Sequence, residues 1–384
     1  MKPTWKHALR AHSMLLALAG IWLFFSVQQP VFLSSRNLSL LLIELSITAS
    51  LALGMLLVLL PGQIDLSAGS GVGLAGALAA VLVFWHGAPA PLALLVAAVV
   101  CVAVWSAMGA LIVRQRIPAF IITLGGLLVF KGLHWLTIKN QTVPVAEGGK
   151  SNVYSLLTTY YLPPVAGYAL AALVLGALVA STLRARARRA SYGFQVADKE
   201  RTFLGLFVTA QLLLLLLIVT NQYRGVPLPA LILGGLALLV HLLTAHTPFG
   251  RYLYAIGSNE EAAFISGVPI QRTLITAFAL MGGVVALTGF MQTAYAGAST
   301  ATVGSLMELD AVAACVIGGT SLRGGRGSVA GVLFGALIMA SLLNGMTLMA
   351  VAPEIKFIAR GVVLALAVWV DVKLNADDPS ASLK

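Results

Sequence analysis

The sequence predicts an all-α membrane protein, a polytopic bundle of about twelve hydrophobic helices. Hydrophobic residues make up 59% of the 384 residues and charged residues only 10%, whereas a soluble domain carries about 25% charged residues. The apolar residues gather in runs, many of them near the length of about 20 residues that one membrane crossing needs. The basic residues, which give a net charge of +11, lie in short stretches between these runs. This pattern excludes an ordinary soluble protein and indicates a multi-pass membrane protein.

Twelve segments are the candidate membrane helices, and one of them, 310–322, is short for a complete crossing. The first segment resembles a signal peptide because basic residues precede it. It ends in Gln28, Gln29 and Pro30 rather than in small residues, so we expect an uncleaved first span. In chain order the twelve segments are 13–29, 38–60, 67–85, 92–113, 117–137, 164–183, 203–219, 228–246, 273–295, 310–322, 327–350 and 355–371.

The loops between the segments predict the orientation of the chain. Most basic loop residues lie at the two termini and after the fourth, sixth, eighth and tenth segments. All of these regions share one side of the membrane if every segment crosses it, including 310–322. Since positively charged loops stay in the cytoplasm, we expect both termini and the loops 184–201 and 247–272 to be cytoplasmic. The loop 138–162 is the longest on the opposite side.

The sequence contains no recognisable catalytic, metal-binding or nucleotide-binding motif. The glycine-rich stretch from Gly319 to Gly327 has Gly325 where a phosphate-binding loop requires Lys. Cys101 and Cys315 lie in apolar runs and are interpreted as small buried hydrophobic residues. The basic clusters lack the exposed aromatics of a nucleic-acid-binding face. We therefore expect no enzyme activity, cofactor, metal or nucleic-acid partner, so active transport would use ATP hydrolysed by another chain or an ion gradient.

One cytoplasmic stretch, 250–272, predicts a short and well-defined helix. Ser258, followed three residues later by Glu261, forms a capping-box pattern. Gly267 suits the left-handed conformation that ends a helix. A helix of about two turns does not persist alone in water, so it needs a surface on which to pack. That surface is either another protein, the membrane, or the helix bundle of this chain.

Four stretches are similar to motifs of the ribose/xylose/galactose-type permeases of bacterial ABC importers. They occur in the order of that family and together cover most of the chain. The resemblance implies one transmembrane permease domain over 1–384, with the type II ABC importer permease fold. The stretches are PGQIDLSAGS from Pro61, PAFIITLGGLLVFKGL from Pro118, GRYLYAIGSNEEAAFISGV from Gly250 and ELDAVAACVIGGTSLRGGRGSVAG from Glu308.

The resemblance also implies a function and a set of partners. It implies the pore-forming subunit of an ATP-driven monosaccharide importer in the bacterial inner membrane. Such a subunit forms a homodimer, binds two ATPase subunits and receives sugar from a periplasmic binding protein. Compared with the ten-span ribose-type pattern, 164–219 resembles an inserted helix pair with a basic cytoplasmic loop, as in the xylose permease branch. The ATPase contact falls on Ser258, Asn259, Glu260, Glu261, Ala262, Phe264, Ser266 and Gly267.

Polar residues inside the segments are candidates for the translocation pathway, since ionisable side chains in the bilayer are costly and tend to be functional. We expect Glu44 and the break at Gln63–Asp65 to face the bundle interior. For Asp65 and Asp310, helix capping and packing explain the residue as well as pathway lining does. The alternative function is an ion-coupled secondary transporter of a small polar solute, although no clear inverted repeat is found. The pathway candidates are Glu44, Ser46, Thr48, Gln63, Asp65, Phe120, Thr123, Gln292, Glu308, Asp310 and Asn344.

Overall fold

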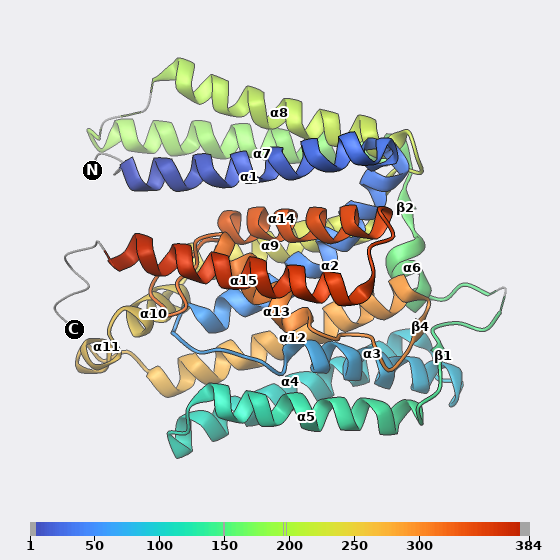
Figure 1. The fold of residues 1–384 in the computed structure, drawn as a ribbon. Coiled ribbons are helices and arrows are strands. Elements are labelled where there is room, and N and C mark those ends of the chain that lie inside the picture. Colours follow the sequence, from blue (N-terminus) through green and yellow to red (C-terminus); the bar gives the residue numbers. More distant parts are fainter. Residues whose placement is uncertain (1–4, 149, 195, 197, 377–384) are drawn as a thin grey trace.

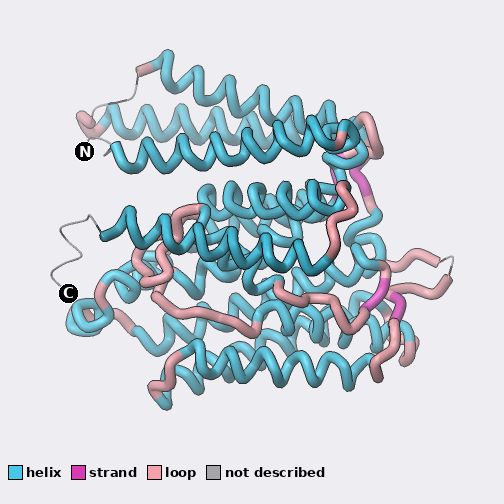
Figure 2. The backbone as a smooth tube through the Cα atoms, in the orientation of Figure 1, coloured by secondary structure: helices cyan, strands magenta, loops and turns pink. Residues whose placement is uncertain are grey.

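The structure is a computed structural model that describes residues 5–148, 150–194, 196 and 198–376. The described residues form fifteen α-helices, one 3-10 helix and four strands of two residues each. The long helices run roughly along one common axis (Figure 1), and helix dominates the whole chain trace (Figure 2). The all-α prediction is therefore confirmed.

Each of the twelve predicted segments is a helix in the structure. Eight of them, α2, α4, α5, α7, α8, α9, α12 and α14, are long and apolar enough to cross a membrane. The twelve helices are α1 (Trp5–Gln28), α2 (Ser35–Leu59), α3 (Ala68–Phe84), α4 (Ala90–Gln115), α5 (Ala119–Ile138), α7 (Pro164–Ser191), α8 (Lys199–Asn221), α9 (Leu228–His246), α12 (Ile270–Ala296), α13 (Met307–Ile317), α14 (Val329–Leu348) and α15 (Pro353–Ala376).

The short elements mark the two ends of the bundle. At one end, called here the strand end, β1 (Val143–Pro144) pairs antiparallel with β4 (Ala298–Ser299), and β2 (Tyr161–Leu162) with β3 (Val226–Pro227). The short helix α6 (Val153–Thr159) lies there too, and η1 (Pro30–Leu33) links α1 to α2. At the other end, called the α11 end, lie α10 (Pro248–Ser258) and α11 (Glu260–Ile265). The beginning of α1 and the end of α15 share this α11 end (Figure 1).

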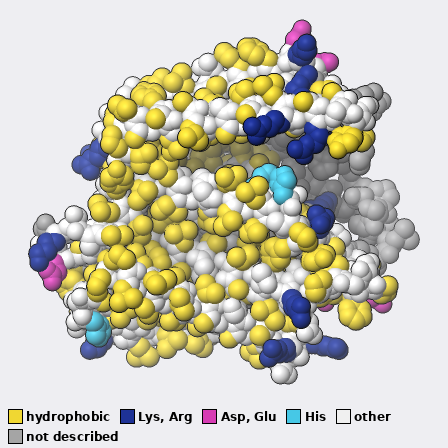
Figure 3. Space-filling view, turned by 180° about the vertical axis from the view of Figure 1, so that it is seen from behind, with side chains coloured by type: hydrophobic (Ala, Val, Ile, Leu, Met, Phe, Trp, Pro, Cys, Tyr) yellow, Lys and Arg dark blue, Asp and Glu magenta, His cyan; other side chains and the backbone are white. Residues whose placement is uncertain are grey.

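The hydrophobic core is centred on α2 and α12, whose most apolar 18-residue stretches are 78% and 67% buried. These two helices pack on α3, α4, α13 and α14. By contrast, α1, α7 and α8 form a separate layer at the top of Figure 1. Figure 3 shows a largely hydrophobic surface along the helices, with most Lys and Arg side chains near their ends. This distribution fits a protein whose flanks face lipid. Cys101 and Cys315 are buried, as predicted.

Two crossings of the bundle are broken into an irregular part and a helix. The chain leaves α2 at the α11 end, runs without helix through 60–67, and starts α3 only at Ala68. Similarly, the chain leaves β4 at the strand end, runs irregularly through 300–306, and then forms α13. Its 11 residues span only about 16 Å at 1.5 Å per residue. The helix predicted at 310–322 therefore begins earlier and ends at Ile317, because consecutive glycines follow it.

Candidate functional site

The break before α3 is organised around the buried carboxylate of Asp65. This carboxylate accepts hydrogen bonds from the Ser67 backbone N–H (2.8 Å), the Ser67 hydroxyl (2.6 Å) and the Trp105 indole N–H (2.7 Å). The hydroxyl of Thr123 donates to the backbone carbonyl of Ile64 at 3.2 Å. Asp65 thus faces the interior, as predicted. Its three donors hold the turn before α3, but Asp65 does not cap that helix, because the N-cap residue is Ser67, whose side chain makes no capping hydrogen bond.

The two broken crossings meet where α3 and α13 begin. A Cβ atom at Gly69 would lie 2.6 Å from the backbone oxygen of Gly304 and would also collide with the carboxylate of Glu308. Gly304 itself has a φ of +83°, in the left-handed region. Both backbones therefore approach closely only because these positions are glycines. Glu308 is buried at this junction, with an exposed fraction of 5%.

A cavity of about 310 Å³ lies beside this junction. Four of the predicted pathway residues line it, namely Glu44, Thr48, Gln292 and Asp310. Its other walls include residues of the irregular segment 302–305 and parts of α14 and α15. The cavity therefore collects polar groups from helices that are far apart in sequence.

Glu44 is held in place on this cavity by two neighbours. One carboxylate oxygen accepts a hydrogen bond from the Tyr295 hydroxyl, and the other accepts one from the Asn344 amide, both at 3.0 Å. Asn37 in turn donates to the Asn344 side-chain oxygen at 2.9 Å. On a second wall, the Arg360 guanidinium lies 3.2 Å from the Asp310 carboxylate. The cavity thus offers fixed hydrogen-bond acceptors next to an ion pair.

The remaining pathway candidates do not line the cavity themselves, although Asn344 binds Glu44 on its wall. The Ser46 hydroxyl donates back to Leu42 of its own helix at 2.6 Å, and Gln63 lies half-buried in the break before α3. Phe120 is 52% exposed on the outer surface of α5, away from the cavity. Sequence reasoning missed Trp105, Tyr295 and Arg360. Of these, Arg360 carried a usable signal, because it is an ionisable residue inside a predicted span.

The glycine-rich stretch after α13 packs against α10 at the α11 end. The Gly325 backbone N–H donates to the Leu60 carbonyl at 2.9 Å, and the Tyr254 hydroxyl donates to the Gly327 carbonyl at 2.9 Å. A Cβ at Gly324 would lie 2.8 Å from the Cα of Gly257. Close backbone packing, not phosphate binding, therefore explains this glycine cluster. The sequence motifs that begin at Pro61, Gly250 and Glu308 therefore contact one another at this glycine cluster.

The predicted helix at 258–267 is present as α11, but its cap lies one residue later than expected. Ser258 is the last residue of α10. Asn259 adopts the extended conformation of an N-cap, with φ −162°, and its side chain accepts from the Ala262 N–H at 2.9 Å. The Ser258 capping box is thus wrong, because α10 extends through Ser258. The helix ends at Ile265 with Ser266 as its C-cap, and Gly267 follows in the predicted left-handed conformation, with a φ of +78°.

The outward surface of α11 exposes two large apolar side chains beside the two glutamates of its first turn. Phe264 and Ile265 are 70% and 79% exposed, whereas Ala263 between α11 and the bundle is buried. The helix therefore does not bury its large apolar side chains against its own bundle. All of the predicted ATPase-contact residues are exposed on the segment 258–267, called here the α11 knob. They are Ser258, Asn259, Glu260, Glu261, Ala262, Phe264, Ser266 and Gly267.

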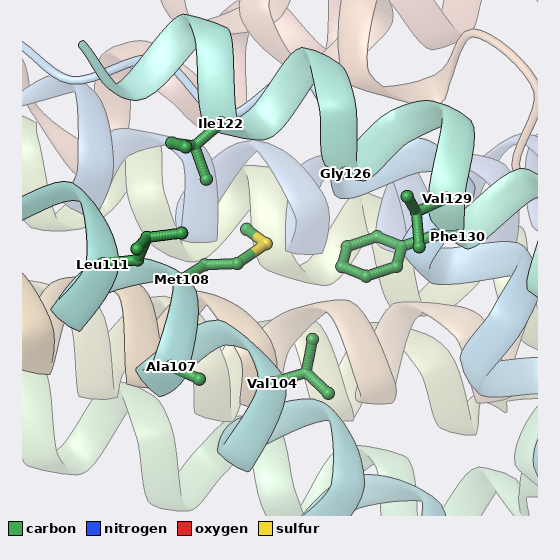
Figure 4. Close-up of a pocket in the computed structure, with 8 residues that line it drawn as sticks. All are labelled: Val104, Ala107, Met108, Leu111, Ile122, Gly126, Val129 and Phe130. Atoms are coloured by element: carbon green, nitrogen blue, oxygen red, sulfur yellow. The ribbon is translucent and has the colours of Figure 1, made fainter. Parts of the chain in front are cut away.

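A second cavity, of about 320 Å³, lies between α4 and α5. Figure 4 shows its walls, formed by Val104, Ala107, Met108, Leu111, Ile122, Gly126, Val129 and Phe130. None of these side chains offers a hydrogen bond, apart from the weakly accepting Met sulfur. This groove therefore suits a hydrocarbon chain rather than a polar solute.

Comparison with known proteins identifies the family. The sequence profile of a family described as a branched-chain amino acid transport system permease component matches residues 37–368. The chain belongs to this permease family. This membership confirms that the chain is a transport permease with a polytopic helical fold, and that it is not itself an enzyme. No solved structure matches the chain.

This permease is similar to characterised proteins over nearly its whole length. It is 40% identical to the xylose transport system permease protein of Escherichia coli K12, over 94% of this chain and 92% of that protein. The corresponding Haemophilus influenzae protein is 39% identical, over 94% of this chain and 96% of its own. A ribose import permease of Bacillus subtilis is 32% identical, over 94% and 92%.

Proposed function

We propose that this permease is the pore-forming subunit of an ATP-driven importer for a monosaccharide, with xylose as the substrate. The observation that carries the proposal is the 40% identity, over 94% of the chain, to a xylose permease, against 32% to a ribose permease. ATP hydrolysis belongs to a separate subunit, because this chain has no nucleotide-binding motif of its own. A periplasmic sugar-binding protein supplies the substrate.

The cavity beside α2 supports a neutral polyol as the transported solute. Its volume of about 310 Å³ lies at the lower end of the usual range for small-molecule sites, about 300–1,000 Å³. Glu44, Thr48, Gln292 and Tyr295 provide acceptors and donors suited to hydroxyl groups. Because the binding protein supplies affinity, this cavity needs only to pass the sugar. Of the other pathway candidates, Asn344 supports the same route because it holds Glu44, and Glu308 does so from the buried junction beside the cavity.

The α11 knob supports ATPase coupling over the stretch 250–272. Its exposed Phe264 and Ile265 suit a cleft on a partner, in the manner of helix-in-groove recognition. Behind it, α10 contacts Gly324 and the end of α2, from which the chain runs directly to the break at Asp65. A displacement of α11 is therefore transmitted, through the packed backbone of α10, to both broken crossings.

The arrangement of the ends supports the topology. The beginning of α1, the end of α15 and α11 all lie at one end of the bundle (Figure 1). With the basic loops between the helices, this arrangement supports a cytoplasmic α11 end and cytoplasmic termini. The strand end then faces the binding protein. A second copy of the chain completes the pore. The helix pair α7 and α8, over 164–219, is the insertion typical of the xylose branch.

Reconstituted transport tests the proposal. Proteoliposomes containing this permease, its ATPase and its binding protein should accumulate radiolabelled xylose only when ATP is present on the ATPase side. Competition by unlabelled xylose should exceed competition by unlabelled ribose. Uptake driven by a proton or sodium gradient without ATP would contradict the proposal and favour a secondary transporter. ATP-driven uptake of ribose in preference to xylose would contradict only the substrate.

A further inference from the structure

The hairpin of α7 and α8 is attached to the bundle only in part. Near the strand end, Ala171, Leu217 and Val226 form a small buried cluster that joins the hairpin to β3. Elsewhere the two helices are exposed, since only 11% and 6% of their most apolar 18-residue stretches are buried. Figure 3 shows a recess between the layer of α1, α7 and α8 and the rest of the bundle. Apolar helix surface is thus open to hydrocarbon on several sides.

The hairpin carries a concentrated positive charge at the α11 end. Arg184 and Arg188 are exposed and lie one helical turn apart on α7, so they share a face. Arg186 instead links α7 to the start of α8, because its guanidinium donates to the Thr202 hydroxyl and to the Asp198 backbone carbonyl. Arg189, Lys199 and Arg201 add further exposed charge. The exposed acidic residues described nearby are Asp198 and Glu200.

Exposed aromatic side chains lie in the turn that follows these arginines and at the start of α8. Tyr192 and Phe194 are 72% and 67% exposed in the turn between the two helices. Phe203 is 69% exposed, and its ring stacks on Phe207 with centroids 5.9 Å apart. Tyr side chains gather at the headgroup level of a bilayer, and Phe side chains insert at the boundary between headgroups and acyl chains. The tip of the hairpin therefore combines interfacial aromatics, a cationic face and apolar helix below it.

We propose that this tip is a binding site for an anionic phospholipid. Arg184 and Arg188 hold the headgroup phosphate, and the acyl chains lie along the exposed apolar surfaces of α7 and α8, in the recess below the tip. Guanidinium groups suit this ligand because they bind phosphate oxygens bidentately and are always charged. The lipid would occupy the side of the hairpin that the protein leaves uncovered, and so fix the hairpin against the bundle.

A lipid fits this surface better than a second copy of the chain does. A two-fold contact through the tip would bring the same arginines toward each other. Basic clusters between transmembrane helices are also a recognised way to bind anionic headgroups. The inference concerns residues outside the cavity and outside α11, so it stands independently of the proposed sugar specificity.

The test is a titration of delipidated permease with phosphatidylglycerol or phosphatidylcholine, followed by native mass spectrometry and thermal unfolding. We expect phosphatidylglycerol to bind and to raise the unfolding temperature, and phosphatidylcholine to do so far less. The variant Arg184→Gln/Arg188→Gln should lose about 10- to 30-fold in phosphatidylglycerol affinity. The matched control is Arg114→Gln/Arg116→Gln, which removes two exposed charges from the α11 end of α4. It should bind like the parent protein.

Several outcomes would overturn the inference. Equal losses in both double variants would reduce the effect to general surface charge. Equal binding of the two lipids, or the same stabilisation by inorganic phosphate, would remove the anionic lipid as the ligand. A concentration-dependent dimer that disappears in the Arg184/Arg188 variant would assign the tip to a second copy. Arg184→Lys/Arg188→Lys keeps the charge but loses the bidentate geometry, so it should fold and bind with an affinity between those of the parent and the Gln variant. Binding no better than that of the Gln variant would also count against the inference.

Discussion

The junction of the two broken crossings makes a sharp prediction for Gly69→Ala. The new Cβ would lie 2.6 Å from the backbone oxygen of Gly304, closer than carbon and oxygen atoms approach in folded proteins. The carboxylate of Glu308 could rotate aside, but the backbone of Gly304 cannot, because it packs directly on the backbone of α3, where even a Cβ at Gly304 would lie 2.1 Å from the Gly69 oxygen. The starts of α3 and α13 must therefore move apart.

The size of the effect follows from two opposing terms. Forcing an extra methyl group into a packed interior costs about 1–3 kcal/mol. Replacing Gly by Ala inside a helix otherwise stabilises it by up to about 1 kcal/mol. Gly125 in α5 is a matched control, because a Cβ there would meet no atom within 4 Å. Because that helix gain is common to both variants, we expect Gly69→Ala to be less stable than Gly125→Ala by about 1–3 kcal/mol.

Unfolding of both variants in mild detergent with increasing dodecyl sulfate measures this difference. Unfolding can be followed by circular dichroism or intrinsic tryptophan fluorescence, with the parent protein alongside. Equal stability of Gly69→Ala and Gly125→Ala would show that the backbones at the junction do not pack as closely as described. The reasoning on the broken crossings would then be refuted.

Four further predictions concern coupling, topology and the cavity. Glu261→Gln/Phe264→Ala should reduce ATPase co-purification and uptake several-fold while the permease stays folded; full binding and uptake would contradict the coupling role. Asn259→Ala should weaken the same activities less, since a lost N-cap costs about 0.5–2 kcal/mol. A cysteine at Ser191 should react with an impermeant maleimide only in inside-out vesicles, and labelling of intact cells would reject the twelve-span topology. Tyr295→Phe should release one oxygen of Glu44 and lower the uptake rate with unchanged ATPase binding; unchanged uptake would separate Glu44 from the pathway.

The sequence determined those features that depend on local patterns. Apolar runs located every long helix, because a membrane crossing requires a continuous stretch of apolar residues whatever surrounds it. Gly267 and Pro269 located the end of α11, since left-handed φ and a missing N–H are properties of the residue itself. The start of α11 was placed one residue early, because Ser258 and Asn259 are both good caps and only packing decided how far α10 extends.

The tertiary structure decided which of these elements meet. Tyr295 and Asn344 lie 251 and 300 positions from Glu44, yet both bind its carboxylate. Trp105 likewise holds Asp65 across 40 positions. No local pattern encodes such pairs, because they follow from how whole helices pack. The exposure of α7 and α8 was hidden for the same reason, since a lipid-facing helix and a buried helix are equally apolar in sequence and differ only in their neighbours.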